Sequence, residues 1–132
     1  MGRDHEDRME NSHLASVFRA LEALDVEALL DHYASEFRFE DTAAGVDIVD
    51  RGQLRSYFEA LFSMPGVAFR VLHWFGDDGG NGTGEWVWSG LGPNGARFEV
   101  KGASVFELGP DGITRETIYY KPPGAGVGMS GV

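Results

Sequence analysis

The sequence predicts an α+β fold in which helices cover one face of a mostly antiparallel sheet. Apolar residues recur at helical spacing in the first half of the chain, and the period changes to two after Met64, Pro65 and Gly66. The 132 residues suffice for one domain with a core. We expect this domain over residues 12–122, with a flexible lead-in over 1–11 and a flexible glycine-rich tail over 123–132.

Three helices are expected before the change of period. The first is predicted from apolar residues at intervals of three or four over 14–24. Asp25 is placed to cap a second helix, whose apolar stripe covers 26–33, and Asp50 is placed to cap a third, whose stripe covers 54–62. The helices therefore all precede the main part of the sheet.

The expected strands begin with a short one, FRFED, at 37–41, followed by a loop over 42–52. After the third helix, four segments of alternating polarity are separated by glycine-rich turns, which predicts an antiparallel meander. Gly102 interrupts the longest segment, and a glycine there commonly marks a bulge or bend. Such a bend would let the sheet curl around a cavity.

Composition excludes several classes of function. The formal net charge of −10 repels nucleic acids and anionic membranes, so neither is expected as a partner. Cysteine is absent, the four histidines form no paired metal motif, and GVGMSG at 126–131 lacks the strand and helix of a nucleotide site. No metal and no cofactor are therefore expected. The N-terminal residues lack the apolar core of a signal peptide, which predicts a cytoplasmic protein.

The strand FRFED carries an acid on its apolar face. Phe37, Phe39 and Asp41 point to one side, while Arg38 and Glu40 point to the other. An inward carboxylate loses hydration, which suits it to act as a base near neutral pH. The alternative, and the commoner role, is a strand-end aspartate that binds the backbone of the following loop.

Other side chains could join Asp41. His73 is in phase with the phenylalanines of FRVLHWF, which makes it a candidate proton donor or a core histidine satisfied by a neighbour. Trp86 and Trp88 share a face and would line a cavity or form a dimer contact. The hydroxyls of Tyr57 and Tyr119 are candidates to polarise a carbonyl group.

Residues 14–122 resemble the SnoaL-like branch of the NTF2-like superfamily, which includes ketosteroid isomerases and polyketide cyclases. ALDVEALLDHYASEFRFED, RGQLRSYFEALFSMPGVAFRV, the tryptophan-rich strand before GPNGARFEVKGASVFEL, and DGITRETIYYKP carry the resemblance in this order. It implies a cone in which a curved, mostly antiparallel sheet wraps around three N-terminal helices and encloses a central apolar pocket. It also implies a homodimer formed through the sheet.

The resemblance assigns roles to individual positions. FRFED falls where ketosteroid isomerases have VED, which places Asp41 on the catalytic base. The tyrosine and the aspartate of their oxyanion hole fall at Val17 and near Ser104, so steroid isomerisation is not expected. Many related cyclases end this segment with YYDP where this chain has YYKP, and Glu116 on the last strand is a candidate to substitute for that acid.

Taken together, the residues and the resemblance predict a protein that binds a small hydrophobic molecule. As a cofactor-free isomerase or cyclase it would use Asp41 as general base, assisted by His73 or Tyr57. The pocket is expected to be lined by Val17, Phe18, Phe37, Phe39, Phe58, Phe62, Trp86, Trp88, Ser104 and Tyr119. The alternatives are ligand binding without catalysis, which the missing oxyanion donors favour, and a dimeric interaction module.

Overall fold

The computed structural model describes residues 13–77 and 80–123, so the predicted lead-in and nearly all of the predicted tail lie outside the described residues. The first helix covers 13–22 in this part of the chain. The remaining elements are α2 (Val26–Leu30), β1 (Tyr33–Asp41), β2 (Val46–Ile48), α3 (Arg51–Phe62), β3 (Ala68–Gly76), β4 (Gly82–Leu91), β5 (Arg97–Gly109) and β6 (Gly112–Tyr120).

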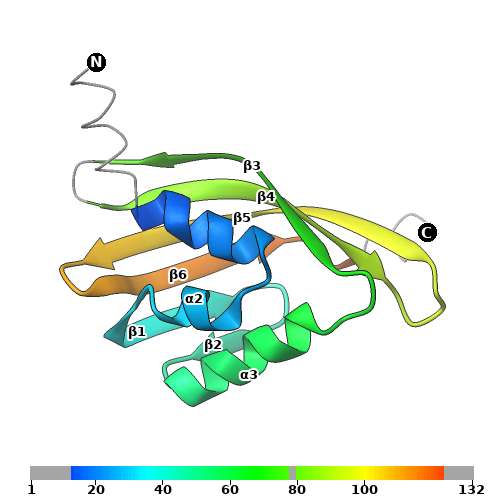
Figure 1. The fold of residues 1–132 in the computed structure, drawn as a ribbon, viewed down its shortest axis with the longest axis horizontal. Helices are drawn as coiled ribbons and strands as arrows, with labels where there is room; N and C mark the ends of the chain where they lie inside the picture. Colours follow the sequence, from blue (N-terminus) through cyan, green and yellow to red (C-terminus); the bar gives the residue numbers. More distant parts are fainter. Residues whose placement is uncertain (1–12, 78–79, 124–132) are drawn as a thin grey trace.

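The strands form one six-stranded sheet in the order β2-β1-β6-β5-β4-β3. Only the β1–β6 pair is parallel among these neighbours, and the other pairs are antiparallel. Figure 1 shows the three helices on one side of this sheet, which curves around them. The α+β class and the curved, mostly antiparallel sheet are thus confirmed.

Both predicted helix caps are present. Asp25 accepts a hydrogen bond from the Ala28 amide at 3.1 Å, and Asp50 accepts one from the Gln53 amide at 2.9 Å. Each bond satisfies an amide that the first helical turn leaves without a partner. The bend between the first helix and α2 lies at Leu24, which has φ of 57°.

The strands begin earlier and are more numerous than the sequence pattern predicts. The second helix ends at Leu30, and Tyr33 starts β1 although its spacing fits the helical stripe. Tyr33 pairs with Ile113 of β6, and the Ile113 amide donates to the His32 carbonyl at 2.8 Å. Pairing with a distant strand therefore outweighs the local helical pattern. The predicted loop contains the short strand β2.

The register shifts of the sheet lie on β1, on β3 and near the end of β5 rather than at Gly102. Pairing between β4 and β5 runs without a break past Gly102, whereas the β3–β4 register shifts between Val71 and His73. Gly102 instead makes room for the Trp86 ring, because a Cβ atom at this position would lie 2.3 Å from a ring carbon. The glycine therefore serves close packing against the Trp86 ring.

The core lies between the helices and the concave face of the sheet. Its most deeply buried large residues include Phe39, Leu54, Phe106 and Ile113, which come from β1, α3, β5 and β6. In the described part of the chain, no helix is both long and apolar enough to cross a membrane.

Candidate functional site

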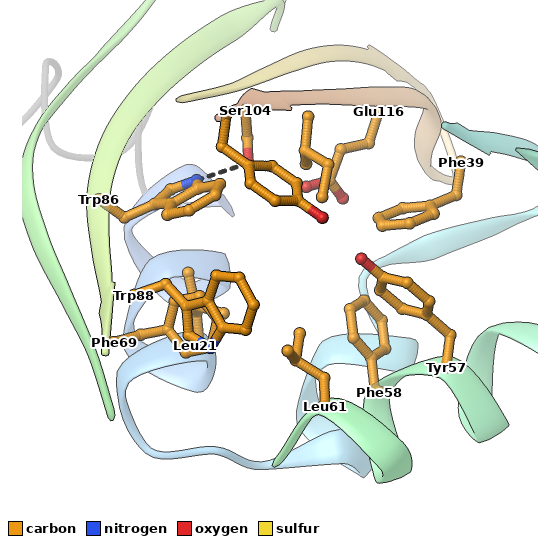
Figure 2. Close-up of a pocket in the computed structure, with 12 residues that line it drawn as sticks. Leu21, Phe39, Tyr57, Phe58, Leu61, Phe69, Trp86, Trp88, Ser104 and Glu116 are labelled. Atoms are coloured by element: carbon orange, nitrogen blue, oxygen red, sulfur yellow. Dashed lines mark hydrogen bonds between the residues drawn. The ribbon is translucent and has the colours of Figure 1, made fainter. Parts of the chain in front are cut away.

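A cavity of about 60 Å³ lies between the concave face of the sheet and the helices (Figure 2). Most of the side chains around it are aromatic, and they come from the first helix, β1, α3 and β3 to β6. Its lining residues are Leu21, Phe39, Tyr57, Phe58, Leu61, Phe69, Trp86, Trp88, Ser104, Glu116, Ile118 and Tyr120. We name this space the aromatic cavity.

Asp41 is buried behind the wall of the aromatic cavity and is not one of its lining residues. Its Oδ2 accepts hydrogen bonds from the hydroxyls of Tyr57 at 2.7 Å and Tyr120 at 2.9 Å. Its Oδ1 accepts a third from the Ala44 amide at 3.0 Å. The carboxylate thus faces inward and also binds the following loop, so both sequence interpretations describe part of its environment.

Tyr57 and Tyr120 form the polar part of the wall in front of Asp41. Burial raises the pKa of both hydroxyls, and the hydrogen bonds to Asp41 add to this effect. Each hydroxyl proton is directed at the carboxylate, which leaves the lone pairs of the oxygen to accept hydrogen bonds from a ligand. Figure 2 shows the Tyr57 oxygen turned toward the interior of the cavity.

Glu116 is the carboxyl group that lines the aromatic cavity itself. Desolvation by burial raises its pKa from 4.5 to about 7, although hydrogen bonds with Tyr33 and Ser104 act in the opposite direction. The Tyr33 hydroxyl donates to Glu116 Oε1, and Trp86 Nε1 donates to Ser104 Oγ at 2.9 Å (Figure 2). A chain of hydrogen bonds therefore fixes this acid in the wall.

The cavity contains acidic but no basic side chains. None of its lining residues is lysine, arginine or histidine, and the only lining acid is Glu116. Within residues 13–77 and 80–123, Glu116 takes part in no ion pair. Trp88 Nε1 is buried and has no hydrogen-bond partner among the described residues.

Six of the residues chosen from the sequence meet around the cavity, namely Phe39, Tyr57, Phe58, Trp86, Trp88 and Ser104. Four others, Val17, Phe18, Phe37 and Phe62, belong to the surrounding core without lining it. Phe18, for example, packs edge-on against Phe106, and Phe37 packs against Tyr33. These four side chains thus pack against core neighbours and do not line the aromatic cavity.

His73 lies on the outer side of β3, outside the cavity lining. The shift of register after Val71 adds a residue to β3, which reverses the alternation beyond it. Trp74 consequently turns inward and stacks with Phe18, while His73 Nε2 lies within hydrogen-bond distance of Glu85 Oε1, 2.7 Å away, on the exposed side. The prediction that His73 shares a strand face with Phe69 is therefore wrong, because the alternation holds only before this bulge.

Tyr119 is 52% exposed and lies outside the cavity, while its neighbour Tyr120 lines it. Glu116, Ile118 and Tyr120 alternate along β6 and share the inner face. The sequence contains this alternation, and the apolar Ile118 indicates which face is buried. That signal would have identified Glu116 and Tyr120, whereas Leu21, Leu61 and Phe69 carried only the signature of core residues.

In the part of the chain that the structure describes, histidine and acidic side chains do not gather into a metal site. Among residues 13–77 and 80–123, no group of three or more such side chains is arranged to hold an ion. The polar atoms of the cavity are instead hydroxyls, an indole and a carboxyl group.

Comparison with known proteins identifies the domain type. A sequence model described as the SnoaL-like domain matches residues 14–116. No match is found among curated proteins.

Solved structures share the fold at low sequence identity. One is a hypothetical protein with a ketosteroid isomerase-like fold from Catenulispora acidiphila DSM 44928, in complex with trimethylamine. It has 20% sequence identity and a TM-score of 0.71, and the match covers 83% of this chain and 85% of that chain. Another is SalBIII, an epoxide hydrolase/cyclase-like enzyme with a role in pyran ring formation in polyether salinomycin. It has 20% sequence identity and a TM-score of 0.72, and the match covers 86% of this chain and 91% of that chain. A third is an NTF2-like protein from Burkholderia thailandensis E264. It has 19% sequence identity and a TM-score of 0.74, and the match covers 85% of this chain and 90% of that chain. These likenesses confirm the NTF2-like fold.

Proposed function

Because the chain belongs to the SnoaL-like domain family, we propose that its aromatic cavity binds a small, largely apolar molecule and catalyses a cofactor-free proton transfer on it. One observation carries the proposal: Glu116 is buried in the wall of an otherwise aromatic cavity with its pKa raised to about 7. A carboxyl group with this pKa is present in both its acid and base forms near neutral pH, as efficient proton transfer requires.

The proposed step moves one proton and changes no oxidation state. Glu116 takes a proton from a carbon next to a carbonyl group and returns it to another atom of the same molecule, as in an isomerisation. In this proposal the donor to the carbonyl oxygen, as charge develops there, is Trp88 Nε1, which has no partner among the described residues. The fold shared with SalBIII, an epoxide hydrolase/cyclase-like enzyme, supports this class of chemistry.

Asp41, the base expected from the sequence, acts indirectly in this proposal. The hydroxyls of Tyr57 and Tyr120 lie between its carboxylate and the cavity, so it reaches a substrate only by a relay through one of them. Its proposed main role is to orient the two hydroxyls. Glu116, by contrast, lines the cavity directly.

Substrate size follows from the cavity. Pockets for drug-sized ligands have volumes of about 300–1,000 Å³. The aromatic cavity has about 60 Å³, which fits a molecule of few non-hydrogen atoms.

The test is hydrogen–deuterium exchange at carbon. We would incubate the full chain in D₂O with small ketones, some neutral and some carrying an ammonium group, and follow exchange by proton NMR. The wild type should accelerate exchange for at least one ketone, Glu116→Gln should lose the acceleration, and Glu99→Gln should keep it because Glu99 is exposed on β5. No acceleration by the wild type for any ketone would refute the proposed catalysis.

One observation favours binding without catalysis. The hydroxyls of Tyr57 and Tyr120 already donate to Asp41, so neither offers its proton to a developing oxyanion. A cavity of this kind would hold a metabolite unchanged. Mass spectrometry of the purified protein that finds a bound molecule, together with no exchange in D₂O, would support this second function.

We also propose that the outer face of the sheet mediates a homodimer. Trp86 and Trp88 face the cavity and are not part of this surface, but Phe75, Val105 and Tyr119 are exposed large hydrophobic residues on β3, β5 and β6. Sedimentation at several concentrations should show a dimer that Val105→Glu weakens. A wild-type chain that remains monomeric throughout would refute it.

A further inference from the structure

The charge of the aromatic cavity restricts its ligand. Glu116 is 7% exposed and lines the cavity without any basic side chain among the lining residues. Behind the wall, Asp41 is 2% exposed and is bonded through Tyr57 and Tyr120. A buried carboxylate is costly without an opposite charge. An anionic ligand would therefore be repelled, whereas a cation would supply the missing partner.

The aromatic wall suits a cation as well as an apolar molecule. Rings of Phe39, Tyr57, Phe69, Trp86 and Trp88 surround the space, and the electron-rich face of an aromatic ring attracts organic cations. Edge-to-face contacts hold several of them in place, including Phe69 against Trp86 with centroids 5.7 Å apart. Such a set of fixed rings forms a cage without further rearrangement.

Hydrogen bonding points the same way. The oxygens of Tyr57 and Tyr120 give their protons to Asp41, so they present lone pairs to a ligand. Glu116 is an acceptor in its ionised form as well. These oxygens turn partial negative charge toward the ligand, which attracts an organic cation with or without an N–H group.

We propose, resting on the ligand-binding role given to the cavity above, that its ligand is a small organic cation of the alkylammonium class whose charge is balanced by Glu116. The net charge of the chain, −10, favours the approach of such a ligand. The positive charge would ionise Glu116 on binding and so prepare it to accept a proton.

Among the groups around the cavity, Glu116 is the one whose protonation a bound cation should change. The titratable side chains that face it are Tyr33 of β1, Tyr57 of α3 and Tyr120 of β6, and the pKa of each is raised. Asp41 of β1 lies behind the last two. The first helix, β4 and β5 present Leu21, two tryptophans and Ser104, which do not titrate.

The test compares tetramethylammonium with tert-butanol, a neutral molecule with the same number of non-hydrogen atoms. Binding to the full chain is measured by tryptophan fluorescence and by calorimetry at constant ionic strength. At pH 8 the cation should bind at least about tenfold more tightly than the alcohol. Its affinity should fall about tenfold for each pH unit below 7, with release of a proton, because binding requires ionised Glu116.

Variants separate the role of the acid from general effects. Glu116→Gln should lower the affinity for tetramethylammonium to that for tert-butanol and abolish both its pH dependence and the proton release. Glu99→Gln, which changes an exposed acid on β5, should behave as the wild type.

The outcomes distinguish this inference from the proposed function. Equal binding of the two molecules by the wild type overturns the preference for a cation but leaves the ligand-binding role. Binding of neither molecule overturns both. Tight, Glu116-dependent binding of the cation without exchange of any ketone in D₂O supports the cation site and refutes the catalysis.

Discussion

The substitution Glu116→Gln should change how stability depends on pH. Glu116 ionises near 4.5 when exposed to water and near 7 in the folded protein, because burial disfavours its charged form. The folded state therefore binds a proton that the unfolded chain releases between these two values. Stability from this source is fully present below pH 4.5 and is lost as pH rises through 7.

The size of the effect follows from the two pKa values. Each pH unit between 4.5 and about 7 is worth about 1.4 kcal/mol, so ionised Glu116 lowers the free energy of unfolding by about 3 kcal/mol above pH 7. Glutamine keeps the acceptor for Tyr33 but cannot ionise. Relative to the wild type, the variant should therefore gain about 3 kcal/mol of stability between pH 4.5 and pH 8.

Urea denaturation at several pH values between 4.5 and 8 measures this change. The difference in free energy of unfolding between variant and wild type is the relevant quantity, since other titrating groups cancel in it. The same difference for Glu99→Gln should stay nearly flat, because Glu99 is exposed. A difference for Glu116→Gln that is constant over this range would refute the claim that burial raises its pKa.

Three further substitutions test packing and hydrogen bonds in the described structure. Asp41→Asn should cost about 1–3 kcal/mol in urea denaturation, since an amide cannot accept all three bonds that the carboxylate accepts; an unchanged midpoint contradicts this. Gly102→Ala should cost about 1–3 kcal/mol and alter tryptophan fluorescence, because the new methyl group meets the Trp86 ring. Unaltered emission would show that the ring is free to move. Asp50→Ala should cost about 1 kcal/mol in thermal unfolding through loss of the α3 cap, and an unchanged melting temperature argues against this cap.

Local signals in the sequence predicted most of the fold. Asp25 and Asp50 are caps whose effect depends on the next few residues, and both positions are correct. Tyr33 is different, because its spacing continues the helical stripe while its partner Ile113 lies far along the chain. No local pattern contains that pairing, so the start of β1 was missed.

The site was harder to predict than the fold because the side chain of each strand residue lies on either the inner or the outer face of the sheet. The sequence predicts that Asp41 faces inward because two phenylalanines lie on the same side of β1, and Asp41 is buried in the structure. His73 was placed by the same reasoning, but the register shift after Val71 reversed its direction. Nothing in FRVLHWF marks that bulge, since it depends on how β3 pairs with β4.

The strand β6 shows how much function depends on this alternation. Shifting its faces by one residue would place Arg115, Thr117 and Tyr119 at the cavity, and the buried polar groups would become a cation and two hydroxyls. The observed faces instead place Glu116 and Tyr120 there, which gives the cavity its acidic character. The pairing of β6 with β1 therefore determines the preferred charge of the ligand, because it fixes Glu116 beside Tyr33 and Tyr120 beside Asp41.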